Sequence, residues 1–71
     1  MEIEWEDGFA IKVGVDDDKN VVISANKEGL LSLARQLNAL ANEAIGSHYH
    51  YDMYNSLEEG SSELIIEKIE G

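Results

Sequence analysis

The sequence contains no cysteine and no proline, and its 71 residues include only one tryptophan and one phenylalanine. Without cysteine there is neither a disulfide nor a thiolate metal site, so a reducing cytoplasm is the expected location. We see no basic leader before an apolar run and no long uncharged stretch, so we expect neither a secretion signal nor a membrane span. The absence of proline leaves every candidate strand free to pair.

Basic residues are also scarce. Five Lys and Arg stand against 15 Asp and Glu, which gives a formal net charge of −10. Binding to DNA, RNA or an anionic membrane is therefore not expected, because contacts to phosphate need cations. Two interpretations remain: the acid keeps a small protein soluble, or it faces a basic protein partner and steers that partner into place. Composition alone does not separate the two.

The length indicates a single small domain spanning residues 1–71, which buries only about 60% of the surface of its unfolded chain. Within it, residues 26–45 have the periodicity of one amphipathic helix. Asn26 can cap its first turn, and Gly46 follows its expected end. The predicted apolar stripe consists of Leu30, Leu33, Ala34, Leu37, Leu40, Ala41, Ala44 and Ile45. The predicted solvent face consists of Glu28, Ser32, Arg35, Gln36 and Glu43.

Five short segments show the alternation or β-branched content of strands. They are residues 1–5, 9–15, 21–25, 48–53 and 63–69. The last segment is apolar on both faces, which favours a central position. We therefore predict a two-layer α+β domain, with the helix on a mostly antiparallel sheet of four or five strands in the order 1-2-3-5-4. The first two segments are either separate strands or one long bent strand.

The residue types needed for catalysis are not arranged in any recognisable pattern. There is no cysteine, the serines lie at caps or in loops, and no glycine-rich phosphate loop is present. We therefore predict that the protein is not an enzyme and needs no cofactor. One metal hypothesis stays open, because His48, His50 and Asp52 alternate on one side of a predicted strand and imidazole with carboxylate suits zinc or iron.

A cluster of tyrosines and acids follows the predicted helix. We expect Tyr49 and Tyr51 to pack in the core, because one face of their strand must meet the helix. Tyr54 is expected at the surface, where tyrosine is enriched among the anchors of protein interfaces. Together with neighbouring carboxylates it forms the candidate partner-binding set, which is Asp52, Tyr54, Glu58 and Glu59.

Three segments in order, SANKEGL, GSHYHYD and NSLEEGSSELIIE, resemble a known family. From Ser24 to Ile69 the chain is similar to the immunity proteins of bacterial polymorphic toxin systems, specifically immunity family thirty-two. The resemblance implies a protein that is encoded beside a secreted toxin and protects the producing cell by binding the toxin domain. Many such toxins are nucleases with basic grooves, so the resemblance favours the second interpretation of the acidic charge.

The resemblance supplies no inhibitory residues, so the candidate set depends on charge and position. Two alternatives stay open: a non-catalytic structural or adaptor protein that is a monomer or a homodimer through an open sheet edge, and a metal-binding module. The toxin, its chemistry and the inhibiting face are not identified by the sequence.

Overall fold

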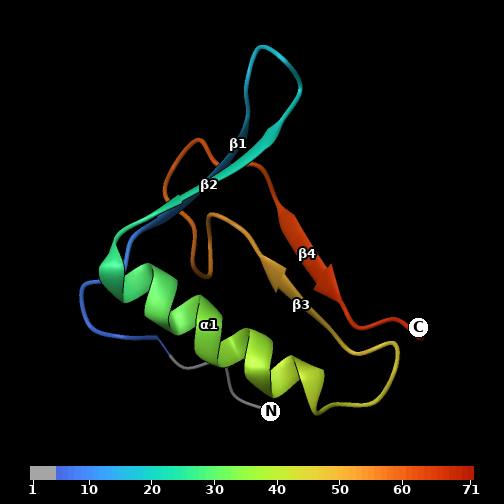
Figure 1. Cartoon of the computed structure of the whole chain (residues 1–71). Helices are drawn as coiled ribbons and strands as arrows, with labels where there is room; N and C mark the ends of the chain where they lie inside the picture. The colour runs from blue at the N-terminus through green and yellow to red at the C-terminus, as the bar shows by residue number, and fades with distance from the viewer. Residues whose placement is uncertain (1–4) are drawn as a thin grey trace.

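The computed structural model describes residues 5–71, and its secondary structure is α+β, as predicted (Figure 1). The elements in chain order are β1 (Ile11–Val15), β2 (Val21–Ala25), α1 (Lys27–Ala41), β3 (His48–Tyr51) and β4 (Leu64–Glu67). Four of the five predicted strands are thus present, β2 with the predicted bounds and the other three in shorter form. The predicted opening strand falls on residues 1–5, of which residues 1–4 lie outside the described part of the chain.

The strands form two separate antiparallel pairs rather than one sheet, so the predicted order 1-2-3-5-4 is wrong. Strand β1 pairs with β2 with Val13 opposite Ile23, and β3 pairs with β4 with Tyr49 opposite Ile66. The last strand is therefore not central. The prediction assumed that both apolar faces of this strand are covered. Only the face with Leu64 and Ile66 packs against the core, and Ile65 on the other face is 54% exposed.

The edge of β1 that was expected to continue the sheet is occupied by an irregular segment. The N–H of Glu58 donates to the carbonyl of Ile11 at 2.8 Å, and the N–H of Ser62 donates to the carbonyl of Val13 at 2.8 Å. Figure 1 shows this segment in orange beside the base of the β1–β2 hairpin. It satisfies the backbone of β1 without forming a strand, which separates the hairpin from β3 and β4.

The start of α1 follows the predicted cap. The side-chain oxygen of Asn26 accepts a 2.8 Å hydrogen bond from the N–H of Gly29, which is otherwise without an intrahelical partner. The same oxygen accepts from the N–H of Ala10 at 3.0 Å, and the Asn26 amide donates to the carbonyl of Gly8 at 2.9 Å. One side chain thus ends the hairpin, begins the helix and ties both to the preceding loop.

The buried face of α1 is rotated from the predicted stripe. Its buried residues are Gly29, Ser32, Leu33, Gln36 and Leu40. Ser32 is completely buried, because its hydroxyl donates to the carbonyl of Glu28 and accepts from the N–H of Glu6, each at 2.8 Å. Leu30 and Leu37 are instead 55% and 44% exposed. The core face of α1 therefore carries Ser32 and Gln36, whose polar groups are hydrogen-bonded, in place of the predicted Leu30 and Leu37.

The helix ends at Ala41, short of the predicted residue 45. Lys68, at the far end of the chain, donates from Nζ to the carbonyl of Ala41 at 2.8 Å and to that of Glu43 at 2.6 Å. A cation at this end also suits the negative pole of the helix. Gly46 has the expected positive φ of 95°, yet it lies in the following turn, where its N–H donates to the carbonyl of Lys68.

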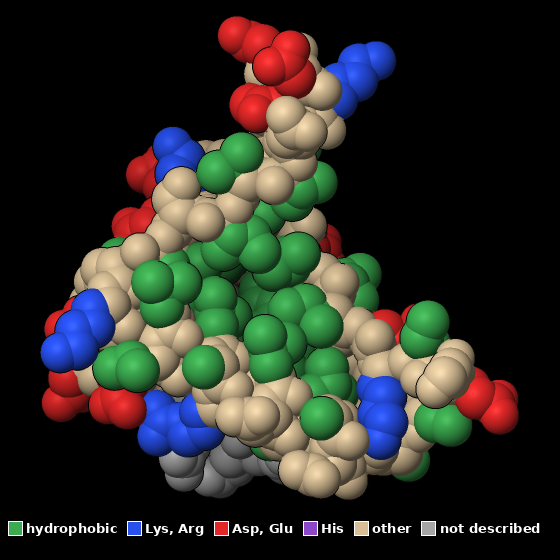
Figure 2. Space-filling view, in the orientation of Figure 1, with side chains coloured by type: hydrophobic (Ala, Val, Ile, Leu, Met, Phe, Trp, Pro, Cys, Tyr) green, Lys and Arg blue, Asp and Glu red, His purple; other side chains and the backbone are tan. Residues whose placement is uncertain are grey.

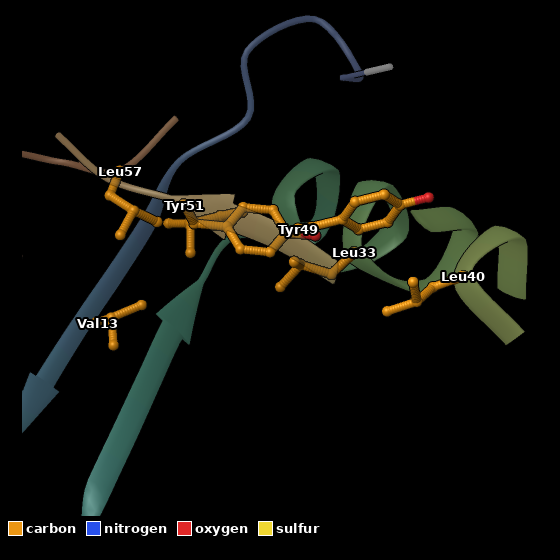
Figure 3. Packing of buried hydrophobic residues seen from close by; sticks show 7 residues of the cluster. Val13, Leu33, Leu40, Tyr49, Tyr51 and Leu57 are labelled. Atoms are coloured by element: carbon orange, nitrogen blue, oxygen red, sulfur yellow. The ribbon is translucent and has the colours of Figure 1, made fainter. Parts of the chain in front are cut away.

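The core lies where the hairpin, α1 and β3 meet (Figure 3). Its buried apolar residues are Ile11, Val13, Leu33, Leu40, Tyr49, Tyr51 and Leu57. Trp5 packs against this cluster and stacks on Phe9 with ring centroids 4.3 Å apart. Within residues 5–71 no helix combines the length and the apolar character that crossing a membrane requires.

Candidate partner-binding surface

The candidate partner-binding set lies in the connection between β3 and β4, and the first half of this connection is a turn organised by Asp52. The Asp52 carboxylate accepts from the N–H of Tyr54 at 2.9 Å and from that of Asn55 at 3.0 Å. The Asn55 side chain closes the turn, since its oxygen accepts from the N–H of Asp52 at 3.1 Å and its amide donates to the carbonyl of His50. Asp52 therefore shapes the loop from within.

The second half of the connection is anchored to the core. Leu57 is 5% exposed, and its N–H donates to the carbonyl of Asp52 at 2.8 Å. The next residue, Glu58, is held to β1 through the bond from its N–H to Ile11. The hydroxyl of Ser61 accepts from the N–H of Val13 at 3.1 Å, and the N–H of the next residue, Ser62, donates to the carbonyl of the same Val13. Residues 52–62 are thus fixed on the body of the protein at both ends and in the middle.

Three members of the candidate set project from this fixed loop. Tyr54 is 92% exposed, the largest value among the exposed large hydrophobic side chains of residues 5–71. Glu58 and Glu59 are exposed as well. The loop therefore presents one aromatic ring and two carboxylates to solvent on a backbone that is already ordered, an arrangement suited to docking on a positively charged protein surface.

The other two tyrosines are core residues, as predicted. Tyr49 is 8% exposed and Tyr51 is completely buried. The Tyr51 hydroxyl donates a 2.8 Å hydrogen bond to Oε1 of Gln36 on α1. Burial, with a smaller contribution from Tyr49, raises the pKa of Tyr51 to about 12. Tyr51 is therefore a neutral structural residue that links β3 to the helix.

The three residues of the metal hypothesis do not converge, although the rings of His48 and His50 lie 4.9 Å apart between centroids. The ring of His48 contacts the carbonyl of Gly46 through Nδ1 at 3.1 Å, and that of His50 contacts the Glu63 carboxylate at 3.3 Å. The Asp52 carboxylate is directed to the N–H groups of its own turn. In the described range, 5–71, no group of three His, Cys, Asp or Glu side chains is placed to hold a metal ion.

The tip of the β1–β2 hairpin is a second acidic site, formed by Asp16, Asp17 and Asp18. The Asp16 carboxylate accepts from the N–H of Asn20 at 2.8 Å and from that of Asp18 at 2.9 Å. Donation from the Asn20 backbone lowers the pKa of Asp16 below its ordinary value. Lys19 adopts a positive φ of 67° in this turn. The tip projects beyond the body of the protein (Figure 2).

A further surface was not anticipated from the sequence. Figure 2 shows hydrophobic side chains gathered between the hairpin, α1 and β3, on the face turned to the viewer. Exposed apolar residues of the hairpin include Val15, Val21 and Ile23, and those of the helix include Leu30 and Leu37. Periodicity had placed Leu30 and Leu37 on the inward stripe of the helix. The apolar residues of this surface are exposed because the two sheets do not join and because α1 is rotated toward Ser32 and Gln36.

These features are those of a small α+β protein whose ordered surface loop is suited to contact another protein. Residues 20–69, more than two thirds of the chain, match the family model described as Immunity protein 32. The chain belongs to this immunity protein family, which confirms the resemblance. It therefore has a role in immunity to a toxin, binds a cognate toxin protein and is not an enzyme. Comparison with curated proteins and with solved structures gives no match.

Proposed function

We propose that this chain is a cytoplasmic immunity protein of a polymorphic toxin system, and that it neutralises a nuclease toxin domain by covering its basic substrate-binding surface. The support for a nuclease is electrostatic. A groove that binds nucleic acid carries cations for the phosphates, and a chain with a net charge of −10 complements such a groove. Inhibition is stoichiometric, because the immunity protein occupies the groove and breaks no bond.

The observation that carries the proposal is the exposure of Tyr54 on an ordered loop. A ring that is 92% exposed gains little in the free protein, yet its neighbours Asp52 and Leu57 hold its backbone in place. Binding then costs little additional ordering, because hydrogen bonds already hold the loop backbone in the free protein. Glu58 and Glu59 accelerate the encounter with a basic surface, and Tyr54 supplies the contact that excludes water.

The electrostatic part is tested by reversing the two glutamates together, as Glu58→Lys with Glu59→Lys. The association rate with the toxin domain of the neighbouring gene is measured at low and at high salt. We expect a loss of tenfold or more at low salt and a smaller loss at high salt, because screening removes the long-range attraction. The matched control is Glu67→Lys with Glu70→Lys, which changes the net charge equally at exposed positions outside the loop.

If both double variants slow association equally, net charge alone steers the encounter and the loop has no special role. If neither has an effect, the occlusion mechanism is wrong.

The anchor is tested by Tyr54→Ala. We expect dissociation to accelerate by about 30-fold or more, because truncating an interface anchor costs on the order of 2 kcal/mol. The control is Met53→Ala, an adjacent side chain that is 43% exposed and whose sulfur accepts from the N–H of Gly60. An unchanged dissociation rate for Tyr54→Ala would place the inhibiting face elsewhere on the protein.

Asp52 has a positioning role in this proposal. Asp52→Ala removes the acceptor of two N–H groups and is expected to weaken toxin binding by disordering the Tyr54 backbone. Asp52→Asn keeps an acceptor oxygen at the same place and is expected to retain most of the affinity. If Asp52→Asn is as damaging as Asp52→Ala, the negative charge itself contacts the toxin.

A further inference from the structure

Strand β2 has an open edge. At the two ends of the β1–β2 ladder, the N–H of Asp16 donates to the carbonyl of Asn20 and the N–H of Asn26 donates to the carbonyl of Ala10. Hydrogen-bonded pairs recur at every second residue of an antiparallel ladder, so Gly14 with Val22 and Lys12 with Ser24 are the hydrogen-bonded pairs between these ends. The backbone groups of Val22 and Ser24 therefore point to β1, and those of Val21, Ile23 and Ala25 point away from it. Within residues 5–71 these outward groups make no backbone hydrogen bond.

The side chains of this strand are also poorly covered. Val21, Val22 and Ile23 are 65%, 42% and 43% exposed, and no residue of β2 is fully buried. Three of the five residues of β2 are β-branched, and the strand is uncharged and free of proline and glycine, so it lacks the usual protections of an edge. By contrast, the outer edge of β1 is satisfied by Glu58 and Ser62. An unprotected edge of this composition is a template for pairing with another strand.

We propose that β2 pairs with β2 of a second copy of this chain, forming a homodimer with a continuous four-stranded antiparallel sheet. The two-fold axis passes between the two Ile23 residues. Because both the N–H and the C=O of Ile23 point outward, the two copies exchange both bonds at the axis. Val21 of each chain then lies opposite Ala25 of the other, so every outward group of the strand gains a partner.

The chain exposes more surface than the average folded monomer of its mass. A folded monomer of 7.9 kDa is expected to expose about 4,400 Å². The chain exposes 5098 Å². The excess of about 700 Å² approaches the roughly 800 Å² that each partner buries in an interface of standard size. The two-fold axis is perpendicular to the extended sheet, so both helices lie on the same face, the one on which Ile23 is paired with the buried Val13.

Charge favours this edge over the rest of the surface. Two chains of −10 repel one another, yet residues 21–26 carry no charge and are flanked by Lys19 and Lys27. The antiparallel pairing places the Asp16–Asp18 tip of one copy at the same end as Lys27 and the positive helix N-terminus of the other. Along residues 21–25 a second copy therefore meets no charged side chain, and at each end Lys19 of one copy and Lys27 of the other lie beside the acidic tip.

The dimer leaves the candidate partner-binding set free. Glu58 lies at the opposite edge of the hairpin, beside β1, and Tyr54 precedes it in the same loop. A dimer would thus present two such loops at its two outer edges. The proposal does not depend on toxin binding, and its tests use the purified chain alone, so it can fail while the proposed function holds, or the reverse.

The first test is the mass in solution, measured by light scattering and by sedimentation over a range of concentrations. We expect twice the chain mass of 7.9 kDa. Ile23→Lys places two ammonium groups together at the axis and is expected to give the monomer. The matched control is Ile65→Lys on β4, a side chain that is 54% exposed at the edge of the other sheet. It is expected to remain dimeric.

Circular dichroism and thermal melting establish that both variants fold. A wild-type monomer throughout the concentration range overturns the proposal. So does a dimer that Ile65→Lys dissociates and Ile23→Lys does not, because the edge of β4 would then form the contact.

The second test requires no disruptive substitution. Amide hydrogen exchange of the wild-type chain is followed residue by residue by NMR. A monomer protects the amides of Val22 and Ser24, whereas the dimer also protects those of Val21, Ile23 and Ala25. Protection of Ile23 that appears only when the toxin domain is added would overturn the proposal, because a strand of the toxin would then be the partner of this edge.

The register is tested with spin labels, since the chain has no cysteine of its own. A label on Ile23→Cys lies near its copy across the axis, at a backbone separation of about 5.5 Å. A label on Val21→Cys shares the strand and the face, yet it lies four residues along the ladder from its copy, about 13 Å away. We expect strong dipolar broadening at 23 and weak broadening at 21. The reverse pattern would refute the register.

Discussion

Tyr51 and Gln36 form a buried hydrogen bond of 2.8 Å between β3 and α1, with the phenolic hydroxyl as donor and Oε1 as acceptor. Tyr51 is completely buried and Gln36 is 4% exposed. This pair explains why a glutamine occupies the core face of the helix. It also fixes the rotation of α1 that leaves Leu30 and Leu37 at the surface.

The substitution Tyr51→Phe removes this bond while keeping the ring. We expect the free energy of unfolding to fall by about 1–2 kcal/mol, because the bond between the Tyr51 hydroxyl and Gln36 is lost while the ring still fills the core. Urea denaturation at neutral pH measures the change. Tyr54→Phe is the control, since Tyr54 is 92% exposed, and it should leave the stability unchanged. Equal effects at both positions would contradict the structural role of the pair.

Alkaline pH should destabilise the protein through the same residue. Burial raises the pKa of Tyr51 from 10.0 to about 12, so the folded chain holds the phenolic proton more tightly than the unfolded chain. This contribution is complete below pH 10 and is lost as the pH rises toward 12. It amounts to about 2–3 kcal/mol, since each pKa unit corresponds to 1.36 kcal/mol. Denaturation measured from pH 8 to 12 should show a steeper loss for the wild type than for Tyr51→Phe.

Glycine at position 29 is required by packing rather than by backbone conformation. A Cβ at Gly29 would lie 2.7 Å from the carbonyl oxygen of Ala10 and 2.9 Å from Cγ1 of Ile11. Alanine in a helix is ordinarily favoured over glycine by about 1 kcal/mol. Here we expect the opposite sign: Gly29→Ala should lower the free energy of unfolding by about 1–3 kcal/mol, because the backbone of the hairpin must move to make room for the added Cβ.

The matched control for this prediction is Gly14→Ala in β1. Apart from Gly14 itself and its two neighbours in the chain, no residue has an atom within 4 Å of a Cβ built at Gly14. Its substitution should be neutral or stabilising by up to about 1 kcal/mol, because glycine weakens a strand. Thermal unfolding of the two variants gives the comparison. A stabilised Gly29→Ala would show that α1 does not approach the hairpin this closely.

Asn26 should contribute more than an ordinary helix cap. Asn26→Ala removes the acceptor of Gly29 N–H and two contacts to the loop before β1. We expect Asn26→Ala to lower the free energy of unfolding by about 2 kcal/mol, which is the upper end of the range for the loss of a helix N-cap. Asn38→Ala, at an exposed position inside α1, should instead stabilise slightly, since alanine is the better helix former. The melting temperature should therefore fall in Asn26→Ala and rise slightly in Asn38→Ala; a fall of similar size in both variants would contradict the capping role of Asn26.

The candidate partner-binding set was partly predictable. Alternation along β3 indicated that Tyr49 and Tyr51 face the core, and Tyr54, beyond the end of the strand, is exposed as expected. The internal role of the Asp52 carboxylate was not anticipated. Its charge suggested a surface contact, whereas its two N–H donors depend on the turn that Asn55 and the burial of Leu57 create.

The sequence by itself determined the local elements of this protein. Each depends on neighbours along the chain: the β-branched strands, the Asn26 cap, and the period that marks α1. Only the tertiary structure decided how these elements join. Ser32 and Gln36 became core residues through Glu6 and Tyr51, and Lys68 met the end of a helix 27 residues earlier. Such partners are distant in sequence, so periodicity carries no information about them. The division into two sheets likewise depends on distant contacts, the bonds of Glu58 and Ser62 to β1.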